Sequence, residues 1–197
     1  MSWLAIIFTF ALVDNVILSR LLGVCPLSDD SGGVRTAAGL GGFTAALMTV
    51  SGLGGWLLDS QVLVPLGFTL LRTPVFVFLV AGLAFALNAV GARFFPSFLT
   101  ATRVSFPSIG VNVAALGLVL VTTRGEYNAF ESLVAGLAAG AGYFLVTALM
   151  MGIRERLEIE PVPRALRGFP LQLITAGLMA YAFMAFDRAF LARVLGG

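Results

Sequence analysis

Long runs of apolar residues, each ended by charged residues or proline, dominate this sequence. A hydrocarbon core about 30 Å thick needs roughly 20 apolar residues for one helical crossing, and the runs have about this length. They predict an all-α integral membrane protein with six transmembrane helices. The six predicted spans are residues 2–24, 36–58, 73–92, 104–122, 129–153 and 168–186.

Two of the six spans contain residues that interrupt an apolar helix. The first carries Asp14, Asn15 and Arg20, and the fourth carries Pro107 and Gly110. Irregular backbone at membrane depth is tolerated where it is buried in protein or lines a cavity. We therefore expect the first and fourth helices to be broken or partly re-entrant.

The two halves of the sequence resemble each other at a nearly constant offset. Asn15 and Asn112 are 97 residues apart, the tripeptide AGL occurs at 38–40 and 135–137, and it recurs at 81–83 and 176–178. Three helices per copy is an odd number, so a second copy would insert upside down. The pattern predicts one membrane domain built as an inverted 3+3 repeat, with halves 1–97 and 98–197.

Composition agrees with a membrane solvent and excludes several functions. Hydrophobic residues make up 59% of the chain and charged residues 11%, against about 25% charged in soluble domains. The twelve basic residues are all arginines scattered between apolar runs, so nucleic-acid binding is not expected. One cysteine and no histidine exclude an internal disulfide, the usual catalytic triads and a thiolate or imidazole metal site made by this chain alone.

The distribution of arginine predicts the orientation, because cytoplasmic loops carry an excess of basic residues. The side that holds the loops after spans one, three and five carries seven arginines, and the opposite side, with both termini, carries four. Both termini are therefore predicted outside the cytoplasm. The seven are Arg35, Arg93, Arg103, Arg154, Arg156, Arg164 and Arg167, and the four are Arg72, Arg124, Arg188 and Arg193.

Asp14, Asn15 and Asn112 are the candidate polar or ion-binding residues of the predicted spans. A carboxylate at membrane depth is a functional candidate because it needs a partner, water or a cation. The alternative for Asp14 is a structural pair with Arg20, which six residues of regular helix would place poorly on the same face, although the break could change that geometry. Asn112 follows the break in the fourth span, where its amide could satisfy freed backbone groups instead.

Small residues in the second and fifth spans indicate close helix packing. The glycines are at 39, 41, 42, 136, 140 and 142, and Gly136 with Gly140 forms a GxxxG pattern. The charged segment between the fifth and sixth spans, GIRERLEIEPVPRALRG, is expected to be a solvated loop that fixes orientation, or a docking surface for a soluble partner.

Cys25 lies before Pro26, next to an expected helix break. A lone cysteine in a membrane protein is usually inert, and iron–sulfur clusters normally need four thiolates. From the residues alone, both an inert thiol and a ligand remain open.

Five segments together resemble a known family. In order and spacing, DNVILSRLLGVCP, FPSIGVNVAALG, GIRERL, VPRALRG and LITAGLMAYAFMAF are similar to the family of membrane proteins found in the Rnf electron-transport complex, as its A component, and in the sodium-pumping NADH:quinone reductase, as its E component. The similarity covers nearly the whole chain.

This resemblance implies a six-helix, inverted-repeat subunit in the bacterial inner membrane, paired with a homologous twin of opposite orientation. It also implies flavin and iron–sulfur subunits in the same complex, which couples electron transfer between ferredoxin and NAD to cation transport. Such a subunit is not catalytic on its own. The alternatives are a subunit of the sodium-pumping reductase, which the acidic-then-Asn pair Asp14-Asn15 resembles, and a non-redox transporter or scaffold of the same fold.

In this family each twin supplies two cysteines to a shared [2Fe-2S] cluster within the membrane. Cys25 matches the first of them, but Val113 stands at the second. Valine cannot ligate iron, and the chain has no other thiol. The resemblance thus implies that Cys25 is one ligand of a cluster completed by a non-standard ligand, or that the cluster is altered or absent.

Overall fold

The computed structural model describes residues 3–20, 34–94, 113–161, 163 and 166–186. Every regular element within these ranges is a helix, as the sequence predicts. Cys25, Pro107, Gly110 and Asn112 lie outside the described residues.

The first predicted span is divided into short helical pieces. Helix α1 (Trp3–Phe8) continues as a π-helical turn, η1 (Thr9–Val13), and after Asp14 and Asn15 the chain resumes as α2 (Val16–Arg20). Single π-turns commonly occur at functional sites in helices. The expected break in this span lies at Asp14, and the corresponding break in the fourth span falls outside the described residues.

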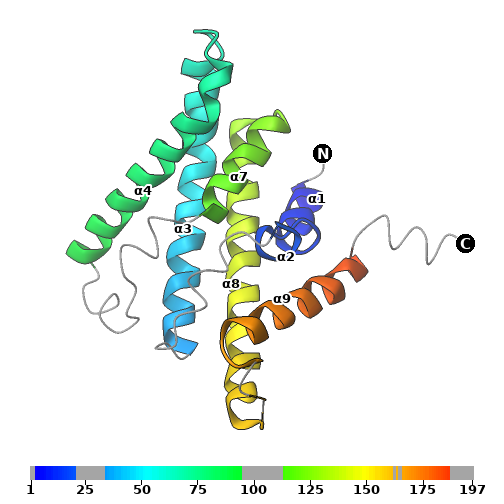
Figure 1. Ribbon diagram of the computed structural model, residues 1–197. Helices are drawn as coiled ribbons and strands as arrows, with labels where there is room; N and C mark the ends of the chain where they lie inside the picture. The colour runs from blue at the N-terminus through cyan, green and yellow to red at the C-terminus, as the bar shows by residue number, and fades with distance from the viewer. Residues whose placement is uncertain (1–2, 21–33, 95–112, 162, 164–165, 187–197) are drawn as a thin grey trace, which may run out of the picture.

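Two long helices, α3 (Val34–Leu58) and α8 (Ala129–Ile159), lie side by side at the centre of the molecule (Figure 1). Glycine allows their backbones to touch, because a Cβ on Gly136 would lie 2.8 Å from Thr49 Cα and one on Gly140 would lie 2.8 Å from Ala45 Cα. The predicted packing role of the GxxxG pattern is confirmed. Gly42 differs from these positions, since a Cβ there would meet nothing within 4 Å.

Three further helices and the broken first span, which packs against α8, surround this central pair. Helix α4 (Arg72–Phe94) packs against α3, and α7 (Val113–Arg124) packs against both α3 and α4. Helix α9 (Phe169–Phe183) contacts α2 and α8. The connection between α3 and α4 contains the π-turn η3 (Asp59–Leu63) and the 3₁₀-turn η4 (Thr69–Leu71), and η6 (Met184–Phe186) follows α9.

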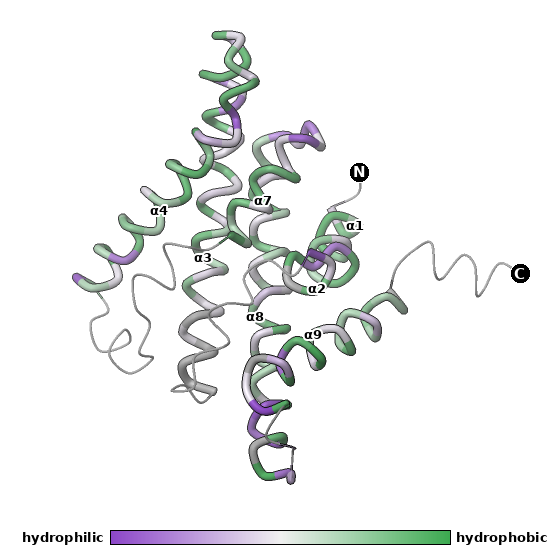
Figure 2. The backbone as a smooth tube through the Cα atoms, in the orientation of Figure 1, coloured by the Kyte–Doolittle hydropathy of each residue, from purple (hydrophilic) through white to green (hydrophobic). Residues whose placement is uncertain are grey.

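Within the described residues, three helical stretches are long and apolar enough to cross a membrane. They are Gly41–Leu63, Thr69–Phe94 and Ala129–Leu157, and shorter apolar helices cover Trp3–Val13, Val113–Arg124 and Pro170–Phe183. Large apolar side chains stay exposed along α4 and α9, which suits lipid or partner helices better than water. Both helices carry many hydrophobic residues along their length (Figure 2). The chain is therefore a multi-pass membrane protein, and the count of six spans stays a prediction.

The charged segment after the fifth predicted span corrects one expectation. The sequence predicts that the membrane helix ends at residue 153 and that a loop follows. In the structure α8 continues to Ile159, so the first part of this segment is helical. Arg, Glu and Leu are good helix formers, and here charge ends the apolar part of the helix without ending the helix.

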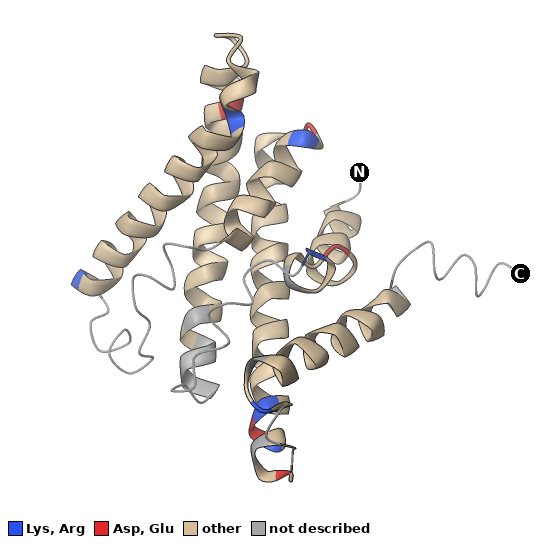
Figure 3. Ribbon diagram, viewed as in Figure 1, with Lys and Arg blue, Asp and Glu red and all other residues tan. Residues whose placement is uncertain are grey.

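Most charged residues of the described chain lie near the ends of the long helices (Figure 3). Arg72 begins α4 and Arg124 ends α7, at the end of the molecule where α3 turns into α4. Arg93 is in the last turn of α4, and Arg154 and Arg156 are in the final part of α8, at the opposite end. The charged pair at the break between η1 and α2 lies away from both ends.

Candidate functional site

The break in the first span changes the spacing of its backbone hydrogen bonds at Asp14. The backbone N–H of Asp14 donates to the carbonyl of Thr9, 2.6 Å away, which is the i→i−5 spacing of a π-helix. The next regular bond is from Ser19 N–H to the carbonyl of Asn15, at 2.8 Å. Asp14 itself has φ −103° and ψ 48°, outside the helical region.

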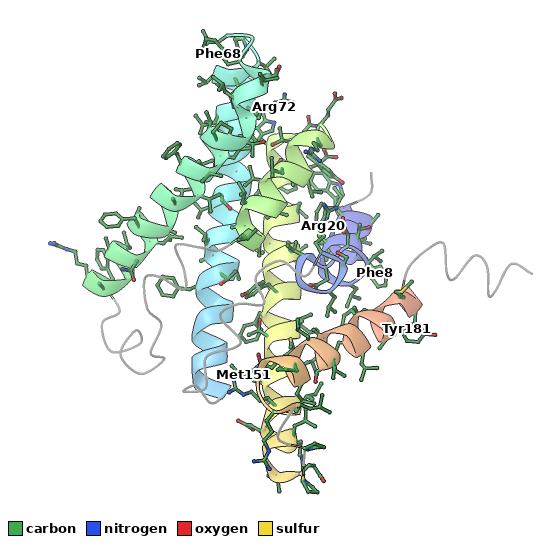
Figure 4. The ribbon with its side chains drawn as sticks, in the orientation of Figure 1. Phe8, Arg20, Phe68, Arg72, Met151 and Tyr181 are labelled. Carbon is green, nitrogen blue, oxygen red and sulfur yellow. The ribbon has the colours of Figure 1, made fainter. Side chains whose placement is uncertain are left out.

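This altered backbone places Arg20 beside Asp14. One guanidinium nitrogen of Arg20 lies 3.3 Å from Asp14 Oδ2, and the Ser19 hydroxyl lies 3.1 Å from Asp14 Oδ1. The side chains of Arg20 and Asp14 are 44% and 32% exposed within the chain. Asp14 and Arg20, which a regular helix would separate, therefore form an ion pair because the helix is broken between them. Figure 4 labels Arg20 at this place.

Asn15 is buried at the break, where α8 lies against it. Its side chain is buried and its Nδ2 donates to the carbonyl of Ala11, 3.0 Å away. Gly142 of α8 lies directly against this bond, because a Cβ there would be 2.6 Å from Ala11 O and 2.8 Å from Asn15 Nδ2. The break is thus held by one buried amide and by a close backbone contact between α8 and the first span.

A second ion pair, which the sequence analysis missed, joins α3 to α4. Arg72 Nε donates to Asp59 Oδ1 at 2.6 Å and Arg72 Nη2 donates to Asp59 Oδ2 at 3.0 Å, a bidentate geometry. The Asp59 side chain is 14% exposed and that of Arg72 is 32% exposed. The only signal in the sequence was that opposite charges bracket the short apolar connection between two spans.

A polar cavity of about 520 Å³ lies next to this pair, between the α3–α4 connection and the turn that joins α7 to α8. Burial, Glu131 and, more weakly, Asp14 raise the pKa of the Tyr127 phenol above its ordinary value. The Tyr127 ring also meets Phe10 of η1 edge to face, with 5.9 Å between centroids. Tyr127 therefore connects the cavity to the neighbourhood of the break. The lining includes Trp56, Asp59, Arg72, Arg124, Glu126 and Tyr127.

The structure covers only part of the predicted site. Asp14 and Asn15 lie together at the break, whereas Cys25 and Asn112 fall outside the described residues. Val113 is the first residue of α7, and its hydrocarbon side chain is 44% exposed. Among the described residues, no group of three or more His, Cys, Asp or Glu side chains is placed to hold a metal ion.

Comparison with known proteins gives one consistent result. Residues 3–189 match the family model described as "Rnf-Nqr subunit, membrane protein". The chain is 38% identical over 187 residues to the A component of the Na⁺-translocating ferredoxin:NAD⁺ oxidoreductase complex of Acetobacterium woodii, covering 95% of this chain and 97% of that protein.

Two further relatives carry a similar name, as the A component of an ion-translocating oxidoreductase complex. The protein of Yersinia enterocolitica is 36% identical over 175 residues, with 89% of this chain and 91% of that protein covered. The protein of Aeromonas salmonicida is 33% identical over 185 residues, with 94% and 96% covered.

Proposed function

Because this chain belongs to the Rnf-Nqr family of membrane subunits, we propose that it is the A component of an Rnf-type, ion-translocating ferredoxin:NAD⁺ oxidoreductase complex. The observation that carries this proposal is the similarity to proteins of that name over nearly the whole length of both partners. In this role the chain supports electron transfer across the bilayer that is coupled to cation transport, and it has no catalytic activity of its own.

We further propose that the chain has six spans in an inverted 3+3 repeat. Helices α3 and α8 pack antiparallel, since Gly136 meets Thr49 while the later Gly140 meets the earlier Ala45. Helix α7 packs against α3, and α1 with η1 packs against α8. Each central helix then leads into a peripheral one, α3 into α4 and α8 into α9. These reciprocal contacts support two copies related by a two-fold axis in the membrane plane.

The proposed orientation places both termini outside the cytoplasm of a bacterial inner membrane. Arg72 and Arg124 would then lie at the outer end, and Arg93, Arg154 and Arg156 at the cytoplasmic end. The excess of arginine at the second end supports this direction.

The residues of this chain do not by themselves fit a cluster site. Val113 offers no donor atom, and Cys25 is the only thiol in the sequence. We propose that Cys25 supplies this chain's single thiolate to a [2Fe-2S] cluster shared with a homologous, oppositely oriented protein of the complex, which also contains flavin and iron–sulfur subunits. Such a cluster would supply one-electron redox chemistry when bound. The half-exposed position of Val113 at the start of α7 is compatible with a neighbouring protein there.

Asp14, Asn15 and Asn112 are the proposed polar residues on the cation route. The support comes from Asp14, whose carboxylate is partly exposed within the chain and is held by Ser19 and Arg20 at an interrupted helix. Interrupted helices in membrane transporters place polar backbone and side-chain groups at binding sites.

Ferredoxin-dependent NAD⁺ reduction by membranes tests the proposed function. Membranes lacking this chain should lose the activity, and the tagged chain should restore it and purify together with the other oxidoreductase subunits. Restoration of NADH:quinone reductase activity alone would instead assign the chain to the sodium-pumping reductase. Purification without any redox subunit would contradict both complexes and would favour a non-redox transporter or scaffold.

Iron content and the electron paramagnetic resonance spectrum of the reduced complex test the cluster separately. Cys25→Ala should remove a [2Fe-2S] signal, whereas the matched control Val113→Ala should leave it unchanged. An identical spectrum in wild type and Cys25→Ala would rule out a ligand role for Cys25, and the function in the complex would stand without it.

A further inference from the structure

The polar cavity beside the Asp59–Arg72 pair lies at the level where the candidate membrane helices end. Asp59 is in the last turns of the stretch Gly41–Leu63, and Arg72 is in the first turn of the stretch Thr69–Phe94. The turn that closes the cavity on the other side directly precedes the third stretch, Ala129–Leu157. The cavity therefore faces the boundary between the hydrocarbon core and water.

Within the described part of the chain, the charges around the cavity leave one cation and one anion without a partner. Asp59 and Arg72 neutralise each other through their bidentate contact. Arg124 and Glu126 also line the cavity, and neither forms an ion pair or a side-chain hydrogen bond with any residue that the structure describes. The free groups thus match a ligand that carries one negative and one positive charge.

The backbone conformation of Glu126 supports a ligand site in this cavity independently of the unpaired charges. Tyr127 N–H donates to Thr122 O and Glu126 N–H donates to Thr123 O, each at 3.3 Å, which is the Schellman arrangement at the end of α7. Glu126 occupies the C′ position with φ 52°, where glycine is the usual residue because a Cβ is disfavoured. The turn thereby carries a carboxylate in a strained position at the edge of the cavity.

Aromatic side chains complete the chemistry of the cavity. Trp56 and Tyr127 line it alongside the charged groups. Trp and Tyr are enriched at the membrane interface because their rings are apolar and their N–H or O–H is polar. The face of an aromatic ring also attracts an ammonium group.

We propose that this cavity binds the headgroup of a zwitterionic phospholipid with a primary amine, its phosphate at Arg124 and its ammonium at Glu126. The volume of about 520 Å³ is in the range of small-molecule sites. A purely anionic headgroup fits less well, because the charges of Asp59, Arg72, Arg124 and Glu126 sum to zero. The inference requires only that the chain is in a membrane, so it does not depend on the redox role.

Carbodiimide coupling tests the proposal at a single residue. The intact complex is placed in nanodiscs of phosphatidylethanolamine, and the reagent joins a carboxylate to an amine held beside it. Mass spectrometry should find a lipid-modified peptide that contains Glu126. Glu160, an exposed carboxylate at the other end of α8, is the internal control and should remain unmodified. Equal modification of both residues, or none at Glu126, would overturn the proposal.

Variants and competitors separate the sources of the ligand. Arg124→Ala and Arg124→Gln should reduce the modification about tenfold, the loss expected for a hydrogen bond to a charged group, while Arg93→Ala should not change it. Added phosphatidylglycerol should lower the modification of Glu126 only in proportion to the phosphatidylethanolamine that it replaces. Displacement by it would indicate an anionic-lipid site, and displacement by soluble glycerophosphoethanolamine would indicate a free phosphate ester. Coupling of Glu126 to a lysine of another protein in the complex would indicate a protein contact, and each of these results contradicts the proposal.

Glu126→Gly provides a check on the strain. Relief of the positive φ should raise the thermal midpoint of the complex in detergent, where the lipid has been removed. A lower midpoint would show that the carboxylate serves the fold of the turn, and the argument from Glu126 would fail.

Discussion

Two aspartate–arginine pairs occur among the described residues of this protein, and they are built differently. Asp59 and Arg72 are 13 residues apart, belong to different helices and make two hydrogen bonds, at 2.6 and 3.0 Å. Asp14 and Arg20 are six residues apart on one broken segment and make one contact, at 3.3 Å. The first pair also has the more buried carboxylate, with 14% against 32% of the side chain exposed.

The two pairs are therefore expected to behave differently: one fixes the position of two helices, and the other can exchange its contact. A bidentate pair between two helices fixes their mutual position and is favourable only when both partners are present. A single, more exposed contact contributes little to stability and can be exchanged for water or a cation. The geometry thus indicates a stabilising role for the Asp59 pair, whereas the single contact of the Asp14 pair can rearrange more easily.

Removal of one partner of the Asp59 pair should have the largest effect. Asp59→Ala or Arg72→Ala leaves a charge facing a partly enclosed cavity and should lower the free energy of unfolding by about 3 kcal/mol. The double variant should lose much less than the sum of the two. Unfolding in mixed detergent micelles measures all three proteins. Additive losses would show that the two residues act independently and would contradict a stabilising ion pair between them.

Gly142→Ala should cause the second-largest loss of stability, because the structure around Asp14 is held by close packing more than by its ion pair. The new Cβ would press on Ala11 O and Asn15 Nδ2, and overpacking of this kind costs about 2 kcal/mol. Gly152→Ala in the same helix is the matched control, since its Cβ would meet nothing within 4 Å. It should be neutral or stabilising. The same result for both variants would contradict the packing of α8 on the break.

Arg20→Ala and Asp14→Asn should each change stability by about 1 kcal/mol, the net contribution of a single hydrogen bond. The informative measurement is the dependence of coupled transport on cation concentration. We expect Asp14→Asn to shift the cation concentration needed for half-maximal transport, and Arg20→Ala to shift it less. Normal transport by Asp14→Asn would remove Asp14 from the proposed cation route.

Tyr127→Phe should have the smallest effect, confined to alkaline pH. The pKa of Tyr127 is raised above 10.0 in the folded chain by burial, by Glu131 and by Asp14. The stability that this raised pKa contributes is therefore fully present below pH 10 and is lost as the pH rises through the folded pKa. Melting curves between pH 8 and pH 11, as rough limits around the ordinary tyrosine value, should show a smaller alkaline decline in the variant. Asp14→Asn should reduce the decline slightly, and an unchanged decline in both would contradict this origin.

The long helices could be predicted from the sequence because their length is set by the bilayer. The predicted spans 36–58 and 73–92 differ from α3 and α4 by at most two residues at each end. The prediction for α8 was too short by six residues at its C-terminal end, because charge marks where a helix leaves the membrane and not where its hydrogen bonds stop. The break in the first span was predictable because a carboxylate and an amide interrupt an apolar run.

The contacts between distant residues could not be predicted in the same way. The distance from Asp59 to Arg72 depends on a π-turn and a 3₁₀-turn in the connection, and neither has a periodic signal in the sequence. Arg20 reaches Asp14 only because the helix between them is irregular, and the sequence left this pair as one of two alternatives for Asp14. The strain at Glu126 was equally hidden, since the neighbouring Gly125 is the residue that a turn would be expected to use.

The close contact between α3 and α8 also has a consequence for biosynthesis. These helices are far apart in the chain, so ribosomes working at about 5–20 residues per second deliver α8 to the membrane several seconds after α3. During that interval the small-residue face of α3 around Ala45 and Thr49 lacks the helix that covers it in the finished protein. The centre of the molecule is therefore assembled late, and truncation before α8 would leave the broken first span, α3, α4 and α7 without the helix that packs along α3.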